Sequence, residues 1–530
     1  MAKRHTLWQR LATLFVVGCI LLCLSGCREA GINANFVLPL GAEPRQLDPQ
    51  VSSDAASVEL EMALFEGLTR LNETGEPEPA AATWSVSEDR CTYTFSLRTA
   101  VWSDGSPVTA MDFVYGIRRA ADPATASPLK ELLRGIEGAD TVLAGRKPVT
   151  HLGVIAQNTG TLIIRLTKPD TSFLQKLASP PFFPCREAFF TACNGKYGLE
   201  KDYVLGNGPF VLSRWRHGTS ISLARSETYR EKETILPATV RYEISTGESR
   251  LSALTNGTID AALLRSEQEI TAATAAGMNV VSLHDTLYGL WFNCTLPVLN
   301  QAAVRTALRD AVEWDLLKKD LPSSMQAATG YVVPDSVVNN TAYRTEQNAF
   351  SFQTDVAAAS RLQQALGDTA CPQFTLLCTE EELVVARDIV QSWQKNLSVY
   401  FALETVSEEV KNARLKAGNY ELALGNVIPS NNSAVNALAC FASDALAGNY
   451  ARFANQAYDT YVNKAKASGA QRDAEAAEAA LAKQCPMIPI AFVSTHYGVN
   501  PHTENLQIRP FGGGNHGAVF GFMASKKTED

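Results

Sequence analysis

The sequence lacks the residue patterns on which most enzymes depend. It contains no Gly-x-Ser-x-Gly turn, no phosphate-binding loop, and no His-Glu-x-x-His pair among its seven histidines. Residues 512–517 (GGGNHG) match the dinucleotide glycine pattern, but only 13 residues follow, too few for the helix and strand of that unit. Residues 127–130 match Ser-x-x-Lys without the Lys-Thr-Gly partner of penicillin-binding enzymes. We therefore expect no catalytic residue, no metal site and no cofactor.

Positive charge and long apolar runs are also scarce. The formal net charge of the 530 residues is −8. An acidic surface repels phosphate backbones, which argues against nucleic-acid binding. The apolar run at residues 11–24 has 14 residues, short of the roughly 20 that a membrane-spanning helix needs. No later segment is apolar enough to span a membrane, so the sequence predicts a soluble body. The length of the chain predicts several domains.

The N-terminus has the composition of an export signal. Lys3, Arg4 and Arg10 precede the apolar run, and Leu24-Ser25-Gly26-Cys27 follows. Leu-Ser-Gly-Cys resembles a bacterial lipobox, in which the cysteine is lipidated. We therefore expect a signal peptide at residues 1–26, a lipid anchor on Cys27 and a tether over residues 27–35. Several acyl chains would hold the protein on the extracytoplasmic face of a cell membrane.

Cysteine is sparse, and the sequence leaves its redox state open. Eight cysteines follow the lipobox: Cys91, Cys185, Cys193, Cys294, Cys371, Cys378, Cys440 and Cys485. Outside the cytoplasm these could form disulfides, whose connectivity the sequence does not determine. Buried free thiols are the equal alternative.

Strand and helix patterns alternate along the rest of the chain. Residues 91–97 alternate apolar and polar, which predicts a half-buried strand. Thr109 and Asp112 form a capping-box pattern at the start of a helix. Later segments predict helices over 356–366, capped by Asp355, and over 381–396 and 471–484. No repeat or long linker interrupts the pattern, so we expect lobes joined by short crossings.

The order of several short segments resembles one protein family. These segments are residues 46–49 (QLDP), 64–68 (LFEGL), 94–98 (TFSLR), 101–110 (VWSDGSPVTA), 206–210 (GNGPF), 257–260 (GTID) and 304–308 (VRTAL). Their succession over about residues 36–500 is similar to the oligopeptide- and dipeptide-binding proteins of ABC importers, extracellular solute-binding protein family 5. The segment from Val101 to Pro128 is the most specific.

The resemblance implies a fold and its domains. We expect an α/β, two-lobed periplasmic-binding-protein-like fold (type II, cluster C) with an additional domain. The first lobe would comprise residues 36–66, 190–288 and 498–525, the additional domain 67–189, and the second lobe 289–497. The lobes would close over a ligand like a hinged clamp, in a monomer that delivers its ligand to ABC transporter permease subunits.

The resemblance also implies how a ligand binds. In the family an extended peptide is held as an added strand by main-chain hydrogen bonds, with side chains in wet pockets. Candidate contacts are Ser53, Asp54, Ala55, Leu129, Thr286, Tyr288, Gly289, Leu424, Asn426, Val427, Ser430, Asn431 and Asn432.

Several of these positions depart from the family pattern. Ser430 stands where the family has an aspartate that pairs with the peptide's α-ammonium. Val427 stands at a usual tryptophan, Leu424 at a usual arginine, and Leu129 at a usual tyrosine. A buried ammonium without a carboxylate partner would lose several kcal/mol. Free peptide N-termini would then be recognised differently or not at all, while Ser430 and the two asparagines could bond a ligand backbone or form a turn.

The sequence is compatible with four functions to different degrees. The first is capture of oligopeptides for an importer, and the second is capture of another solute, such as an oligosaccharide, a metal chelate or a modified peptide, on the same scaffold. The third is a surface receptor for a peptide signal. The fourth is a secreted hydrolase, which the missing catalytic patterns oppose.

Overall fold

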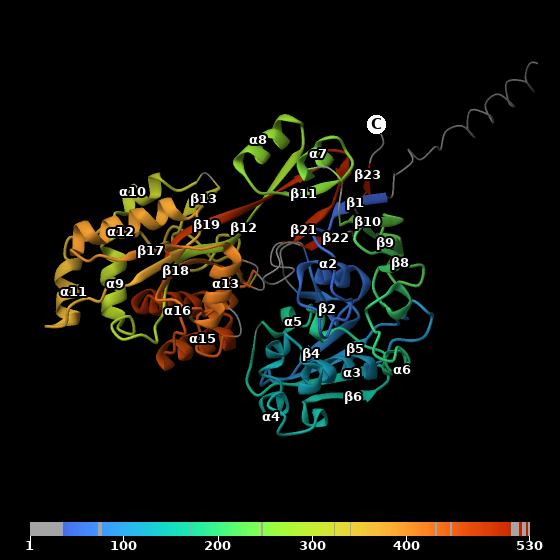
Figure 1. Cartoon of the computed structure of the whole chain (residues 1–530). Helices are drawn as coiled ribbons and strands as arrows, with labels where there is room; N and C mark the ends of the chain where they lie inside the picture. Colours follow the sequence, from blue (N-terminus) through green and yellow to red (C-terminus); the bar gives the residue numbers. More distant parts are fainter. Residues whose placement is uncertain are drawn as a thin grey trace, which may run out of the picture.

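The computed structural model describes residues 35–72, 77–170, 172–244, 247, 249–322, 324–339, 341–429, 432–445, 448–509, 519–521 and 526–527. The predicted signal peptide, the lipidation site Cys27, and the candidate contacts Ser430 and Asn431 lie outside these residues. Figure 1 shows two bodies connected by long strands.

The first lobe is built on a four-stranded sheet. Its strands follow the order β1 (Asn35–Pro39), β10 (Thr239–Glu243), β9 (Ser220–Arg225) and β8 (Phe210–Arg216). Alternation along β1 places Phe36 and Leu38 in the core. Helix α2 (Ala55–Leu64) begins after Asp54, whose carboxylate accepts a hydrogen bond from the backbone N–H of Ser57.

A second four-stranded sheet forms the additional domain. Its strands follow the order β4 (Ala82–Val86), β5 (Thr92–Leu97), β7 (Thr161–Arg165) and β6 (Val154–Asn158). Helix α3 (Ala110–Ala121) packs on β6 and starts with the predicted capping box, in which the backbone N–H of Thr109 donates to Asp112 at 2.7 Å. The short elements of this region are β2 (Thr69–Leu71), β3 (Pro77–Pro79), α4 (Ala139–Leu143), α5 (Phe173–Lys176) and α6 (Glu187–Ala192).

The first lobe and the additional domain share one apolar core. Phe36 and Val240 of the first lobe belong to the same buried cluster as Phe95, Trp102 and Phe113 of the additional domain. All five side chains are fully buried. Because one contiguous buried cluster extends through both units, the two units form one body.

Two long antiparallel strands run between the two bodies. They are β12 (Asn279–Phe292) and β19 (Met487–Val499). At one end β19 pairs with β11 (Ala261–Leu264), which lies beside α7 (Arg250–Thr255), while α8 (Glu267–Ala275) packs against β12 and β19. At the other end they enter the sheet of the second lobe (Figure 1).

The second lobe is a three-layered α/β unit. Beyond β12 its sheet continues through β18 (Leu422–Val427), β16 (Thr375–Cys378) and β17 (Ala402–Thr405), while β13 (Met325–Ala327) pairs with β19. Buried residues of one face pack against α9 (Ala302–Asp310), α10 (Trp314–Lys319), α11 (Ala358–Leu366) and α12 (Leu383–Leu397). The other face packs against α13 (Glu408–Ala417), α14 (Ala434–Ala439), α15 (Gln456–Ser468) and α16 (Gln471–Gln484).

Short elements complete the described chain. The remaining strands are β14 (Val337–Val338), β15 (Thr341–Ala342), β20 (Thr503–Glu504), β21 (Gln507–Arg509), β22 (Val519–Gly521) and β23 (Lys526–Lys527). The 3-10 turns are η1 (Pro123–Thr125), η2 (Lys130–Leu133), η3 (Val149–His151), η4 (Pro180–Phe182), η5 (Lys201–Tyr203) and η6 (Lys232–Thr234). The predicted two-lobed α/β fold with an additional domain is confirmed.

The structure bears on the cysteines and on membrane-spanning segments. All eight cysteines of the described chain carry free thiols, so of the two alternatives the structure shows the unpaired one. Cys185 and Cys193 lie in one small buried cluster with Tyr197. Nowhere in the described ranges does a helix have the length and apolar character needed to cross a membrane.

Candidate functional site

Strand β12 is irregular where it passes between the bodies. Its register against β19 shifts between Leu283 and Thr286, which marks a β-bulge. The backbone N–H of His284 donates to Oδ2 of Asp335 at 2.7 Å. Asp285 is buried, and burial raises the pKa of its carboxyl, although a hydrogen bond from Thr286 opposes the shift. The crossing therefore holds a bend and a buried acid close to the predicted contact Thr286.

The next two candidates on β12 are determined by packing. A Cβ on Gly289 would lie 2.2 Å from the carbonyl oxygen of Ile488, so only glycine allows the two strands to approach so closely. The side chain of Tyr288 is 2% exposed and belongs to the core of the second lobe. Burial raises the pKa of its hydroxyl, and Glu382 adds to the shift. Gly289 and Tyr288 thus serve the packing of β12 within the sheet of the second lobe.

The facing strand β18 turns its candidates in different directions. Leu424 packs in the core on one face of the sheet and Val427 in the core on the other face. Asn426 is exposed and lies opposite Tyr288 in the register. Asn432 is buried, and its backbone carbonyl accepts a hydrogen bond from the backbone N–H of Val337 at 2.7 Å. Asn426 is thus the β18 candidate whose side chain reaches the surface.

The candidates of the first body lie at helix ends and turns. Asp54 is the N-cap of α2, and its second carboxylate oxygen accepts a hydrogen bond from the Ser57 hydroxyl at 2.7 Å. Ser53 is half-buried beside it and Ala55 is exposed. Leu129 is half-buried and directly precedes η2. Ser53, Asp54 and Ala55 therefore lie at the start of α2 and Leu129 at the start of η2, whereas the register of β12 and β18 places Tyr288 opposite Asn426.

Sequence reasoning missed a buried acid on α2. The carboxyl of Glu61 is completely buried, and burial raises its pKa well above the ordinary value. The nearby carboxylates of Asp48 and Asp54 raise it further, while Ser52 opposes them. Its position in the apolar run of residues 55–64 was the available signal, because an acid on the core-facing side of a helix must be neutral or paired.

A cavity lies between the additional domain and the second lobe. It has a volume of about 170 Å³, and we call it the interlobe cavity. The additional domain contributes Leu132, Arg134, Gly135, Leu166, Lys168, Pro169, Asp170, Phe173 and Lys176, and the second lobe contributes Ile428, Asn436, Ala439, Cys440, Asp444, Ala445 and Lys466. Two hydrogen bonds join its walls or their neighbours: Lys168 donates to Oδ1 of Asn463 at 2.8 Å, and Arg90 donates to the carbonyl of Ala467 at 2.9 Å.

The charged residues of the interlobe cavity could not be found from the sequence. Lys168 and Lys466 come from different domains, and no spacing pattern connects them. Lys176 pairs with Asp170 at 2.6 Å, and this ammonium lowers the pKa of Asp170 against the effect of burial. Burial lowers the pKa of Lys466, and Lys176 lowers it further.

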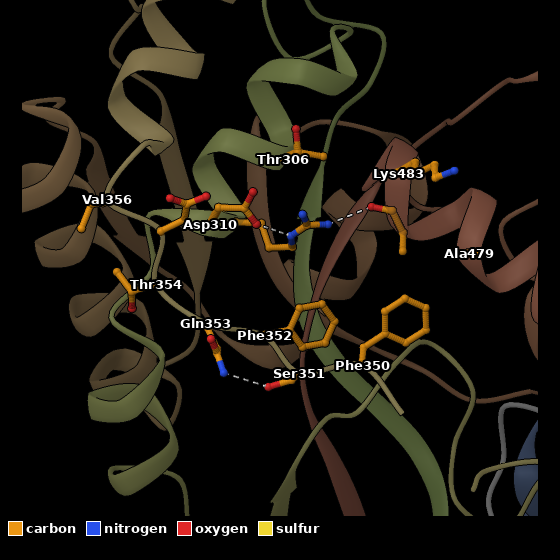
Figure 2. A pocket seen from close by; sticks show the side chains of 13 residues that line it. Thr306, Asp310, Phe350, Ser351, Phe352, Gln353, Thr354, Val356, Ala479 and Lys483 are labelled. Carbon is orange, nitrogen blue, oxygen red and sulfur yellow. Dashed lines mark hydrogen bonds and ion pairs between the residues drawn. The ribbon is translucent and has the colours of Figure 1, made fainter. Parts of the chain in front are cut away.

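Figure 2 shows a second pocket, which lies within the second lobe. It is lined by α9, by residues 350–356 and by α16. Its most buried cation, Arg309, bonds to Oδ1 of Asp310 and to the carbonyl oxygen of Ala482, each at 2.8 Å. Because every residue that lines this pocket belongs to the second lobe, the pocket does not lie between the two bodies.

The described residues provide groups for binding. Amides, hydroxyls, ammonium groups and strand edges can hold polar ligands, whereas no group of three or more potential metal ligands occurs in the described residues.

The profile of the bacterial extracellular solute-binding proteins, family 5 Middle, matches residues 75–449. The dipeptide-binding protein DppE of Bacillus subtilis is 27% identical over 488 residues, 89% of each chain. The periplasmic oligopeptide-binding protein OppA of Escherichia coli is 30% identical over 386 residues, 70% of each chain. The murein tripeptide binding protein MppA of Escherichia coli has a similar structure, with a TM-score of 0.74 and 26% identity over 94% of this chain and 99% of MppA. As the ordered motifs predicted, the chain belongs to family 5 of the bacterial extracellular solute-binding proteins.

Proposed function

We propose that this chain is the substrate-binding lipoprotein of an ABC importer, which captures oligopeptides between its lobes and delivers them to the permease without chemical change. The observation that carries the proposal is the pair β12 and β19. These continuous strands join two separately packed bodies and contain a bulge at the crossing. Within a family of solute-binding proteins, such a crossing supports a hinge that closes over a ligand.

The names of the relatives support peptides as the ligand class. DppE is named for dipeptides and OppA for oligopeptides. A peptide can add to exposed backbone groups as an extra strand, which requires little of individual side chains. Such backbone binding is compatible with Leu424 and Val427 lying in the core.

The proposed membrane attachment rests on the N-terminal sequence. Cys27 in Leu-Ser-Gly-Cys would carry the lipid, and the body would lie outside the cytoplasm as a monomer. Relatives named as periplasmic support that compartment. We also propose the domain bounds given above: 36–66, 190–288 and 498–525 for the first lobe, 67–189 for the additional domain, and 289–497 for the second lobe. The boundary at residue 288 falls within the crossing strand β12, where the side chain of Tyr288 already packs in the core of the second lobe.

Ligand identification tests the proposal. Lipidated protein is extracted from membranes, denatured, and its released small molecules are analysed by mass spectrometry. We expect oligopeptides, a protein mass that includes acyl chains, and a smaller radius of gyration by X-ray scattering when a recovered peptide is added back. Cys27→Ala is the matched control and should lose the acyl mass while keeping the ligand. A single non-peptide solute, or unchanged scattering, would contradict peptide capture.

A non-peptide solute is the second candidate. One relative, 29% identical over 470 residues, is named a probable deoxycholate-binding periplasmic protein of Escherichia coli. The replacement of the expected aspartate by Ser430 also favours a ligand without an α-ammonium. The same mass spectra decide between the two candidates.

A further inference from the structure

The interlobe cavity carries more positive than negative charge. Its cations are Arg134, Lys168, Lys176 and Lys466, and its acids are Asp170 and Asp444. This is unusual in a chain of net charge −8. Leu132, Leu166, Phe173 and Ile428 supply much of the remaining wall. The cavity thus combines an apolar lining with a surplus of ammonium and guanidinium groups.

Most of these charged groups already have partners. Asp170 accepts hydrogen bonds from Lys176 at 2.6 Å and from the hydroxyl of Ser172 at 2.7 Å. Lys168 donates to Oδ1 of Asn463 in the second lobe at 2.8 Å. Arg134 bonds to Asp140 at 2.9 Å on the exposed side.

Lys466 differs from its neighbours. It lies on α15 and lines the cavity, yet it has neither a hydrogen bond nor an ion pair to any described residue. The charged groups that act on it are the cations Lys168 and Lys176 and the acids Asp170 and Asp444. Asp170 is occupied by Lys176, and Asp444 is exposed. An ammonium held in this position without a partner is unfavourable until an anion joins it.

We infer that the interlobe cavity receives an anionic group of the captured ligand, a carboxylate in the case of a peptide, and that Lys466 is its principal partner. This inference rests on the proposed function. Ile428 lines the cavity and directly follows Val427 of β18, so the cavity adjoins the segment in which several ligand contacts are proposed. A carboxylate there would lie between the additional domain and the second lobe and would contribute to holding them together.

A matched pair of peptide pools tests the inference. The lipidated, detergent-extracted protein is first freed of its own ligand. It is then incubated with an equimolar mixture of a casein digest and the same digest whose carboxylates are methyl esters, distinguished by isotope labels. Retained peptides are counted by mass spectrometry. The wild type should prefer free acids by about tenfold, because one charge-assisted hydrogen bond is worth about that much affinity.

Variants assign this preference to Lys466. Lys466→Gln should remove the preference, and Lys466→Arg should retain most of it. Lys464→Gln on the same helix is the control, since this lysine is 65% exposed, and it should behave as the wild type. Lys466→Met should raise the melting temperature of the ligand-free protein, because it removes an unpartnered cation; a decrease would overturn the inference.

The outcomes separate the two proposals. Retention of neither pool by the wild type overturns both peptide capture and the anion site. Retention of both pools without preference, or a preference that persists in Lys466→Gln, overturns the anion site and leaves peptide capture standing.

Discussion

The seam between the first lobe and the additional domain differs in kind from the seam between the additional domain and the second lobe. The first seam is part of one apolar core and includes a buried ion pair, Arg119 to Asp48 at 2.7 Å, with side chains 10% and 6% exposed. The second seam contains the interlobe cavity, with hydrogen bonds from Lys168 and Arg90 beside it. Dry, close-packed seams resist separation, whereas polar seams part at little cost. We therefore expect the first lobe and the additional domain to move as one body, and the second lobe to move relative to them.

The largest expected effect is on the dry seam. Arg119→Met should lower the free energy of unfolding by about 3–5 kcal/mol, because it leaves the buried Asp48 carboxylate without its cation. Urea unfolding followed by circular dichroism measures the loss. The control Arg186→Met breaks a pair with Asp104 whose side chains are 34% and 43% exposed, and it should cost below about 1 kcal/mol. Equal losses in the two variants would remove the distinction.

A smaller effect on the free energy of unfolding is expected from pH, through Glu61 in the body formed by the first lobe and the additional domain. The folded-state pKa of Glu61 is raised, so the folded protein keeps a proton that the unfolded chain releases above about pH 4.5. The free energy of unfolding should therefore fall as pH rises from that value towards the folded pKa, by about 1.4 kcal/mol per pH unit. In Glu61→Gln this component should disappear. Urea midpoints between pH 4 and 8 test it against the exposed control Glu187→Gln; identical profiles in all three proteins would contradict it.

The smallest effect on stability is expected at the polar seam. Lys168→Gln should change the free energy of unfolding by less than about 0.5 kcal/mol, since an exposed contact contributes little. The substitution should increase the radius of gyration of the ligand-free protein, because it removes a hydrogen bond between the two bodies. Arg119→Met is the control in the X-ray scattering measurement. Without denaturant, it should leave the radius of gyration unchanged. A stability loss matching that of Arg119→Met would show that the two seams are alike.

The sequence predicted the parts of the fold that depend on local patterns. The capping box of Thr109 and Asp112 is present, and the helix predicted over 471–484 has those bounds. The helix predicted from residue 356 begins instead at Ala358, because the Asp355 carboxylate accepts the backbone N–H of Ala357 and forms a turn before the helix. Local rules therefore determined element type better than element ends.

The site was less accessible from the sequence. The bulge between Leu283 and Thr286 depends on how β19 pairs with β12, and no pattern within residues 279–292 reveals it. Lys168 and Lys466 line the same cavity only because the additional domain and the second lobe face each other. Partnerships of this kind depend on tertiary packing, so they become visible once the bodies are placed.

The pairing of β12 with β19 also has a consequence for the order of folding. Residues 293–486 separate β12 from β19 in the chain. The two strands nevertheless lie side by side in the middle of the seven-stranded sheet. Closing so long a loop is entropically expensive and slow compared with forming local hairpins. The sheets at β4–β7 and β8–β10 can assemble from nearer neighbours, so the second lobe should acquire its central strand late. A protein that must cross a membrane unfolded would benefit from such a delay.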